Sequence, residues 1–167
     1  MPTSSLWLWG QVIPPGSTGH EAGRALLEKM YRAYTGEALP EIAAAPGGKP
    51  YFPDAPLHFS ISHTPRHVFC ALSPRRVGVD AEELTRNVKL ALAEKILSPG
   101  EYAQYVRAED QRRALLTFWV LKEAQAKCTG RGLTGYPNQT SFSLEDPRVT
   151  TQSGCLVAVM EEETDAV

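Results

Sequence analysis

The chain has 167 residues, enough for one or two small lobes, since a domain of roughly 150 residues buries about 70% of its unfolded surface. Its apolar fraction of 43% argues against disorder, and its net charge of −2, without long runs of like charge, gives no sign of nucleic-acid or membrane binding. Cys70, Cys128 and Cys155 lack metal-ligand spacing, and neither a secretory signal nor a membrane-spanning stretch of ~20 apolar residues is evident. These features favour a soluble, cytoplasmic protein.

The first elements predicted are a strand and a helix. Residues 6–13 (LWLWGQVI) are rich in bulky apolar side chains, which is typical of a strand. Thr18 and Glu21 have the spacing of a capping box, and apolar residues then recur at helical intervals until Gly36. Residues 39–56 are rich in Pro, Gly and Ala and predict a loop or a lobe boundary.

Three short strands are predicted next. Residues 57–62 (LHFSIS) alternate, with Leu57, Phe59 and Ile61 on one face and His58, Ser60 and Ser62 on the other. Residues 67–72 (HVFCAL) and 75–83 (RRVGVDAEE) follow, separated by a turn. Their closeness along the chain predicts an antiparallel meander over residues 57–82.

The second half has a helical period. Residues 88–97 predict an amphipathic helix, and Ser98, Pro99 and Glu101 predict the start of another. The longest helix is expected from about Asp110 to Thr129, with Leu115, Phe118, Trp119 and Leu121 toward a core and Gly130 as its stop. Residues 141–146 (SFSLED) and 155–162 (CLVAVMEE) predict closing strands.

Negative charges end the strand that contains RVGVDAEE. Asp80 and Glu82 lie two residues apart, so in a strand they point to the same side, with backbones roughly 7 Å apart. A divalent cation would relieve their repulsion in a partly desolvated pocket, and hard carboxylate oxygens suit magnesium. The alternative is a solvated strand end. Glu83 points the other way and is expected to face solvent.

Other polar residues allow two interpretations each. Glu123 and Lys127 share a helix face at i and i+4, either as a surface ion pair or as the lining of a cleft. His63 could donate to a phosphate or cap a turn. Lys49, in GGKPY, could bind an anion or be solvated.

Four segments in a fixed order carry a family resemblance. GGKP, SISHT, VGVDAEE and FWVLKEAQAK, within about residues 24–144, resemble the 4'-phosphopantetheinyl transferase superfamily. They are similar in particular to the surfactin-synthetase-activating branch, whose single chain contains two similar lobes. The pairing of G-[IV]-D-x-E with W-x-x-K-E-x-x-x-K is highly specific.

The resemblance implies roles for individual residues. Asp80, Glu82 and Glu123 match the magnesium ligands, and Lys127 matches a lysine that contacts phosphate, as Lys122 could also do. Coenzyme A contacts are implied for Arg32, Lys49, Pro50, Ser62 and His63. The segment before the first helix offers only Arg24 where longer members often carry more basic residues.

The implied reaction is the transfer of 4'-phosphopantetheine from coenzyme A to a serine of an acyl or peptidyl carrier protein. The serine hydroxyl attacks the β-phosphorus, and adenosine 3',5'-bisphosphate leaves. Such a step needs a metal clamp, cationic donors and a base. Asp80, Glu123 and Lys127 are the expected catalytic residues. Glu123 is the candidate base, directly or through a bound water, and Asp80 is the alternative.

The resemblance also implies an α+β fold. Two similar lobes, residues 1–80 and 81–167, would each pack an antiparallel sheet on a long helix, be related by a pseudo-twofold axis, and enclose the active site between them. A monomer is expected, with the carrier protein, from fatty acid, polyketide or nonribosomal peptide synthesis, docking near Val88 to Leu97. The alternatives are a catalytically silent carrier-binding or coenzyme A-binding module and another magnesium-dependent phosphotransferase or phosphodiesterase.

Overall fold

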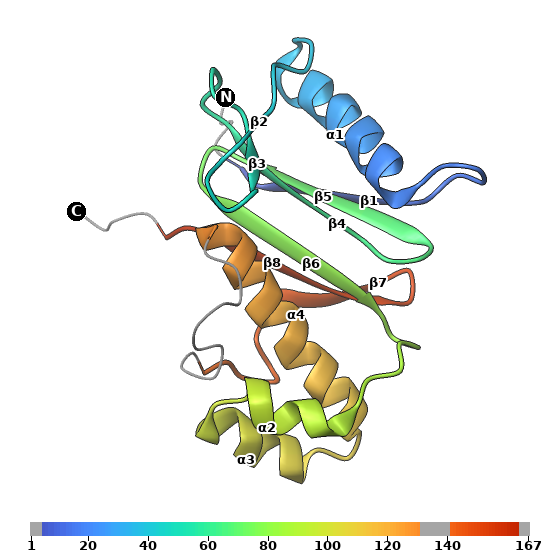
Figure 1. The fold of residues 1–167 in the computed structure, drawn as a ribbon, viewed down its shortest axis with the longest axis vertical. Helices are drawn as coiled ribbons and strands as arrows, with labels where there is room; N and C mark the ends of the chain where they lie inside the picture. Colours follow the sequence, from blue (N-terminus) through green and yellow to red (C-terminus); the bar gives the residue numbers. More distant parts are fainter. Residues whose placement is uncertain (1–4, 131–140, 164–167) are drawn as a thin grey trace.

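The computed structural model describes residues 5–130 and 141–163 and shows an α+β protein of antiparallel sheets and helices (Figure 1). The first sheet has the strand order β1-β5-β4, formed by β1 (Trp7–Val12), β4 (His58–His63) and β5 (His67–Ser73). Helix α1 (Gly19–Thr35) covers the outer face of this sheet. Thr18 and Glu21 form the predicted capping box, and Gly36 ends the helix with a φ of 79°.

The second sheet has the order β6-β8-β7, formed by β6 (Val77–Glu83), β7 (Val149–Gln152) and β8 (Cys155–Glu161). Helix α4 (Gln111–Thr129) lies across its outer face and is capped by Asp110 and Gly130. In each sheet, the first strand is followed along the chain by a long helix and then by two strands that pair with each other. The last of these strands lies in the middle of the sheet. The two sheets therefore have the same strand order.

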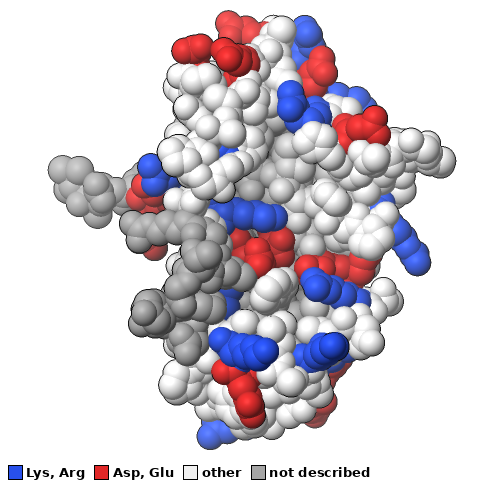
Figure 2. Space-filling model, in the orientation of Figure 1, with Lys and Arg blue, Asp and Glu red and all other residues white. Residues whose placement is uncertain are grey.

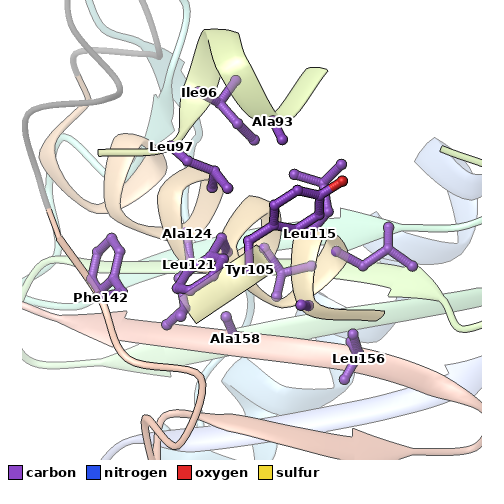
Figure 3. Close-up of a cluster of buried hydrophobic side chains, with 14 of the residues drawn as sticks. Ala93, Ile96, Leu97, Tyr105, Leu115, Leu121, Ala124, Phe142, Leu156 and Ala158 are labelled. Carbon is purple, nitrogen blue, oxygen red and sulfur yellow. The ribbon is translucent and has the colours of Figure 1, made fainter. Parts of the chain in front are cut away.

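Apolar side chains fill three spaces between the layers. One cluster lies between α1 and the first sheet, and a second lies between the two sheets, where Phe69 and Ala71 of β5 meet Val79 of β6 and Val157 of β8. The third lies around α4 and includes Leu115, Leu121 and Leu156 (Figure 3). Strand alternation explains this order, since β5, β6 and β8 bury residues on both of their faces.

The two sheets meet where β4 lies beside the free edge of β6. Val79 N–H donates to Ser60 Oγ at 3.0 Å, and Ala81 N–H donates to Ser62 Oγ at 3.1 Å. Both serines are buried. Side-chain hydroxyls therefore satisfy amides that the strand ladder leaves unpaired.

The predicted meander is wrong in its third strand. β4 and β5 pair as expected, but β6 pairs with β8, in the register Val77↔Glu161 to Glu83↔Cys155. Residues 141–146 form no strand, since β7 begins at Val149. Residues 39–56 contain two short strands, β2 (Ala43–Ala44) and β3 (Pro50–Tyr51).

The helix expected over residues 88–97 is shorter than predicted. A 3-10 turn, η1 (Leu90–Leu92), leads into α2 (Ala93–Ile96), and neither has a side-chain cap at its start. Helix α3 (Pro99–Arg107) begins with the predicted capping box of Ser98 and Glu101. No helix within the described ranges is long and apolar enough to cross a membrane.

Candidate active site

Close packing of α4 against β6 brings the expected site residues together. At Gly78, a Cβ atom would lie 2.0 Å from Ala124 O and 2.4 Å from Cys128 N, so only glycine allows this approach. The next residues of that strand face, Asp80 and Glu82, therefore lie beside the part of α4 that carries Glu123 and Lys127.

Three carboxylates at this junction influence one another. Burial is the main cause that raises the pKa of Asp80, to about 6, and the charge of Glu123 raises it further against the lowering effect of Lys127. Burial and the charge of Asp80 raise the pKa of Glu82. Burial and the charge of Glu82 raise that of Glu123. Burial is thus the main cause of all three shifts, and the repulsion between neighbouring carboxylates adds to it.

Asp80 is the most buried of the three, with 7% of its surface exposed. Its Oδ1 accepts from Lys127 Nζ at 3.1 Å and from Ser62 Oγ at 3.4 Å. Its Oδ2 is buried without a hydrogen-bond partner. Buried polar atoms normally have a hydrogen-bond partner, so this unpartnered oxygen is a candidate to bind a ligand.

Glu82 and Glu123 are half-buried. Glu82 pairs with Arg86 and accepts a hydrogen bond from Trp119, both of which lower its pKa. Glu123 lines a cavity of about 320 Å³, together with Lys49, Pro50, Ser60 and Lys127. In Figure 2, acidic side chains gather in a hollow at mid-height, with basic side chains above and below it.

Two lysines cap carbonyl groups at the same edge of β6. Lys127 Nζ donates to Val79 O at 3.1 Å as well as to Asp80. Lys49 Nζ donates to Val77 O at 3.1 Å and to the carbonyls of Lys127 and Cys128 at the end of α4. Lys49 therefore caps the C-terminus of α4, a favourable place for a cation.

The remaining predicted residues lie apart from this cluster or are already engaged. Lys122 forms a buried ion pair with Glu101, with Nζ 2.8 Å from Oε1. Arg32 lies on the exposed surface of α1. His63 is exposed, and its ring lies against Gly19, at whose position a Cβ would be 2.3 Å from Nδ1. Ser62 is buried against Asp80 and β6.

Sequence reasoning missed Trp119 and Ser60, and it misjudged Glu83. Trp119 lies four residues before Glu123, so helical spacing could have placed it on the same face. Glu83 does point away from Asp80 and Glu82, but it is not solvent-facing. Its side chain is 15% exposed and contacts His67, because the first sheet covers that face of β6.

The carboxylate cluster fits a magnesium ion by its chemistry. Asp80, Glu82 and Glu123 offer hard oxygen donors, one of them an unpartnered buried oxygen, with raised pKa values that a cation would lower. Such a site, next to a cavity lined by partly exposed lysines, can bind and polarise a phosphate-containing ligand.

Comparison with known proteins gives a consistent result. The family model described as the 4'-phosphopantetheinyl transferase superfamily matches residues 76–162. A 4'-phosphopantetheinyl transferase from Bacillus subtilis is 33% identical over 102 residues, which cover 59% of this chain and 45% of that protein.

Two further relatives show the same pattern. The 4'-phosphopantetheinyl transferase Sfp of Bacillus subtilis (strain 168) is 36% identical over 90 residues, 52% of this chain and 40% of the relative. The 4'-phosphopantetheinyl transferase psf-1 of Bacillus pumilus is 32% identical over 131 residues, 76% of this chain and 55% of the relative. The matches therefore span about half the length of these relatives.

Proposed function

Because the chain belongs to the 4'-phosphopantetheinyl transferase superfamily, we propose that it transfers 4'-phosphopantetheine from coenzyme A to a serine of an acyl or peptidyl carrier protein. The serine oxygen would form a bond to the β-phosphorus, the phosphoanhydride bond would break, and adenosine 3',5'-bisphosphate would leave. The observation that carries this proposal is the unpartnered Oδ2 of Asp80 within a cluster of coupled carboxylates.

Asp80, Glu82 and Glu123 would hold Mg²⁺ in this proposal, which would offset the negative charge of the phosphate oxygens. Lys127 supplies a second positive charge at the same place. Its ammonium has three donors, of which two reach Asp80 and Val79, and its side chain is 33% exposed toward the cavity. A donor on the cavity side suits a phosphate oxygen.

Glu123 is the candidate base for the serine proton. It lines the cavity, and burial and the charge of Glu82 raise its pKa, which brings the carboxylate closer to the basicity that proton transfer near neutral pH requires. Asp80 is the alternative, but its unpartnered oxygen is buried.

The coenzyme A contacts are proposed with unequal support. His63 and Pro50 are exposed and can meet a ligand without losing a hydrogen bond that the structure gives them, and Arg32 is likewise exposed. Lys49 and Ser62 would have to give up partners on β6 and α4. We assign Lys122 a structural role, because its ammonium is buried against Glu101.

We further propose that the two halves are lobes related by a pseudo-twofold axis, with the active site between them, which the shared strand order supports. The division into residues 1–80 and 81–167 passes through β6. The carrier protein would dock near Val88 to Leu97, where Leu90 is 45% exposed, although Ala93, Ile96 and Leu97 belong to the core.

Intact-mass measurement of apo carrier proteins tests the activity. Each carrier is incubated with the protein, coenzyme A and Mg²⁺, beside Glu123→Gln and the matched surface variant Glu28→Gln. We expect one phosphopantetheine on a carrier serine with wild type and Glu28→Gln, and initial rates lower by about 10²-fold or more with Glu123→Gln, since one positioned base typically contributes that much.

A chelator should stop the transfer, and excess magnesium should restore it. Coenzyme A binding without transfer to any carrier would replace the proposal by a silent binding module. Cleavage of coenzyme A without a carrier would indicate a hydrolytic enzyme instead.

A further inference from the structure

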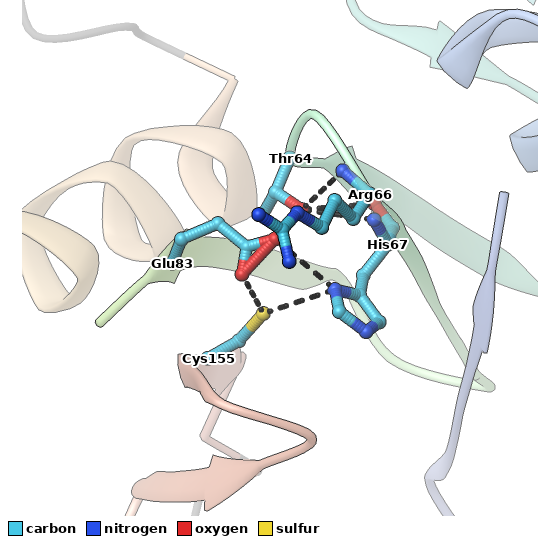
Figure 4. A network of polar contacts seen from close by, with 5 residues as sticks. All are labelled: Thr64, Arg66, His67, Glu83 and Cys155. Atoms are coloured by element: carbon cyan, nitrogen blue, oxygen red, sulfur yellow. Dashed lines mark hydrogen bonds and ion pairs between the residues drawn. The ribbon is translucent and has the colours of Figure 1, made fainter. Parts of the chain in front are cut away.

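Three strand ends meet at one end of the space between the two sheets. His67 is the first residue of β5, Glu83 the last of β6, and Cys155 the first of β8 (Figure 4). His67 belongs to the first sheet, whereas Glu83 and Cys155 are register partners in the second. This group lies on the opposite side of β6 from Asp80 and Glu82.

The ligand atoms of these residues point toward one another. His67 Nδ1 lies 3.1 Å from Glu83 Oε1, Cys155 Sγ lies 3.2 Å from Glu83 Oε2, and Cys155 Sγ lies 3.6 Å from His67 Nδ1. A tetrahedral zinc ion, bound at about 2.3 Å by sulfur and about 2.0 to 2.1 Å by nitrogen or oxygen, separates its ligand atoms by roughly 3.3 to 3.6 Å. The separation of Cys155 Sγ and His67 Nδ1 matches that geometry, and Glu83, which contacts the two through different carboxylate oxygens, would reorient to place one oxygen on the ion.

We propose that His67, Glu83 and Cys155 form a zinc-binding site that joins the two sheets. Each of the three residues offers one ligand atom, and these atoms all lie within 4.8 Å of one another. Among the residues that the structure describes, no other group of three or more His, Cys, Asp or Glu meets this criterion. Its mixture of imidazole, thiolate and carboxylate suits zinc, whereas the all-oxygen set on the other face of β6 suits magnesium. The proposal is independent of the transferase activity.

In the absence of an ion, the three side chains satisfy one another through hydrogen bonds, and, against the raising effect of burial, those from Cys155, His67 and Thr64 lower the pKa of Glu83. Burial, together with the hydrogen bond and the charge of Glu83, raises the pKa of Cys155 to about 12, so the thiol keeps its proton and donates it to Glu83. Such a thiol is a poor nucleophile, which argues against a cysteine-based catalytic site. Zinc binding would displace the thiol proton and replace the hydrogen bonds among the three side chains by bonds to the ion.

Neighbouring residues hold the ligands in place. Thr64 Oγ1 donates to Glu83 Oε1 at 3.1 Å and accepts from His67 N–H at 2.9 Å, while Thr64 N–H donates to His67 O at 2.8 Å. The turn before β5 is therefore tied to the carboxylate before any ion binds. Preorganised ligands of this kind strengthen metal binding.

A cavity adjoins the group at Thr64 and Glu83. This cavity of about 530 Å³ is lined by Thr64, Arg66, Glu82 and Glu83, among others, and the side chains of His67 and Glu83 are 14% and 15% exposed. Three protein ligands leave the fourth tetrahedral position to water from this side.

Cobalt titration into the metal-free full chain tests the site, because Co²⁺ bound by thiolate gives a ligand-to-metal charge-transfer band and intense tetrahedral d–d bands. We expect both, saturating at one ion per chain and abolished by added zinc. Cys155→Ser should remove the charge-transfer band, whereas the matched variant Cys128→Ser should keep it. His67→Gln and Glu83→Gln should weaken zinc binding roughly tenfold or more.

Two results would overturn the site: the absence of a charge-transfer band in wild type, or a band that survives in Cys155→Ser. Glu123→Gln must also retain the band, since its loss there would move the ion to the other face of β6. A measurement on zinc-loaded wild type tests the site without relying on any variant to fold. Its X-ray absorption should show one sulfur at about 2.3 Å, and a shell of nitrogen and oxygen alone would contradict the proposal.

Discussion

The charge of Asp80 costs stability in the absence of a cation. Burial is the main cause that raises its folded-state pKa from 3.8 to about 6, so between these values the folded protein binds more protons than the unfolded chain. Stability then falls as the pH rises through this window, and above about pH 6 the penalty is complete. The difference between the two pKa values corresponds to on the order of 3 kcal/mol.

Asp80→Asn should therefore stabilise the metal-free protein at pH 7, by about 1 to 3 kcal/mol, because an amide removes the buried charge but can still accept from Lys127. Urea unfolding in chelator at pH 7 and at pH 4 measures this, and the gain should disappear at the lower pH. Carrier modification should be lost. A variant that is less stable than wild type at pH 7 would show that the Asp80–Lys127 pair outweighs desolvation.

Lys122 and Glu101 form an ion pair whose side chains are only 2% and 0% exposed. Glu101 also accepts from Ser98 N–H and Phe142 N–H, each at 2.8 Å, so it ties together α3, α4 and the segment before β7. Lys122→Met should cost about 3 to 5 kcal/mol of unfolding free energy, because it leaves a buried carboxylate unpaired.

Urea unfolding of Lys122→Met and of the exposed-site control Lys95→Met tests this role, and the control should stay within about 0.5 kcal/mol of wild type. Coenzyme A affinity, measured where both variants are folded, should be unchanged. A lower affinity with normal stability would instead place Lys122 among the phosphate contacts.

At the scale of elements, the contact of α4 with β6 sets the spacing of the carboxylate cluster. Gly78→Ala would push the helix away, because the added methyl group would overlap the backbone at Ala124 and Cys128. We expect a loss of about 3 kcal/mol or more, at the upper end of overpacking costs, and strongly reduced transfer.

Gly100→Ala is the matched control. Its Cβ would make only an ordinary contact, 3.7 Å from Ser141 Oγ, and alanine is the better helix former by about 1 kcal/mol. Thermal unfolding and carrier modification should therefore separate the two variants. Normal activity in Gly78→Ala would show that the cluster tolerates a shift of α4.

The helices were the most predictable elements, because their start and stop signals are local. Both capping boxes and the left-handed glycines at Gly36 and Gly130 appear where the sequence places them. Local signals could not predict the partner of β6. Its partner β8 lies far along the chain, and the residue pattern of a strand does not show which other strand it pairs with. The error at Glu83 has the same origin. Strand alternation correctly predicts that its side chain points away from Asp80 and Glu82, but it does not show that the first sheet covers that face of β6.

The role of an individual site residue was harder to predict, because one side chain can interact with several kinds of partner. Lys49 was predicted as a phosphate donor, yet it donates to carbonyls of β6 and α4, and a lysine ammonium satisfies either acceptor. The acidic cluster was easier to anticipate, because Asp80 and Glu82 follow strand spacing and Glu123 and Lys127 follow helix spacing. Bringing the two pairs together required the tertiary fold.

At the scale of the whole molecule, Ser60 and Ser62 join the two sheets. Ser60→Ala and Ser62→Ala should each cost about 1 to 3 kcal/mol, because each leaves a buried amide of β6 unpaired. The two variants form a matched pair for urea unfolding. If Ser62 only supports β6 and Asp80, its variant should have the same KM for coenzyme A as wild type, and a raised KM in Ser62→Ala would reveal a direct contact.

The pairing of β6 with β8 also has a consequence for synthesis on the ribosome. Glu83 and Cys155 are register partners separated by 72 residues. At translation rates of about 5 to 20 residues per second, β6 would wait roughly 4 to 14 s for its partner, while every strand of the first sheet has already been made. During that interval, Val77, Val79 and Ala81 of β6, which are buried in the folded protein, lack the strand that later pairs with them, so a chaperone that covers apolar segments would have a binding site there.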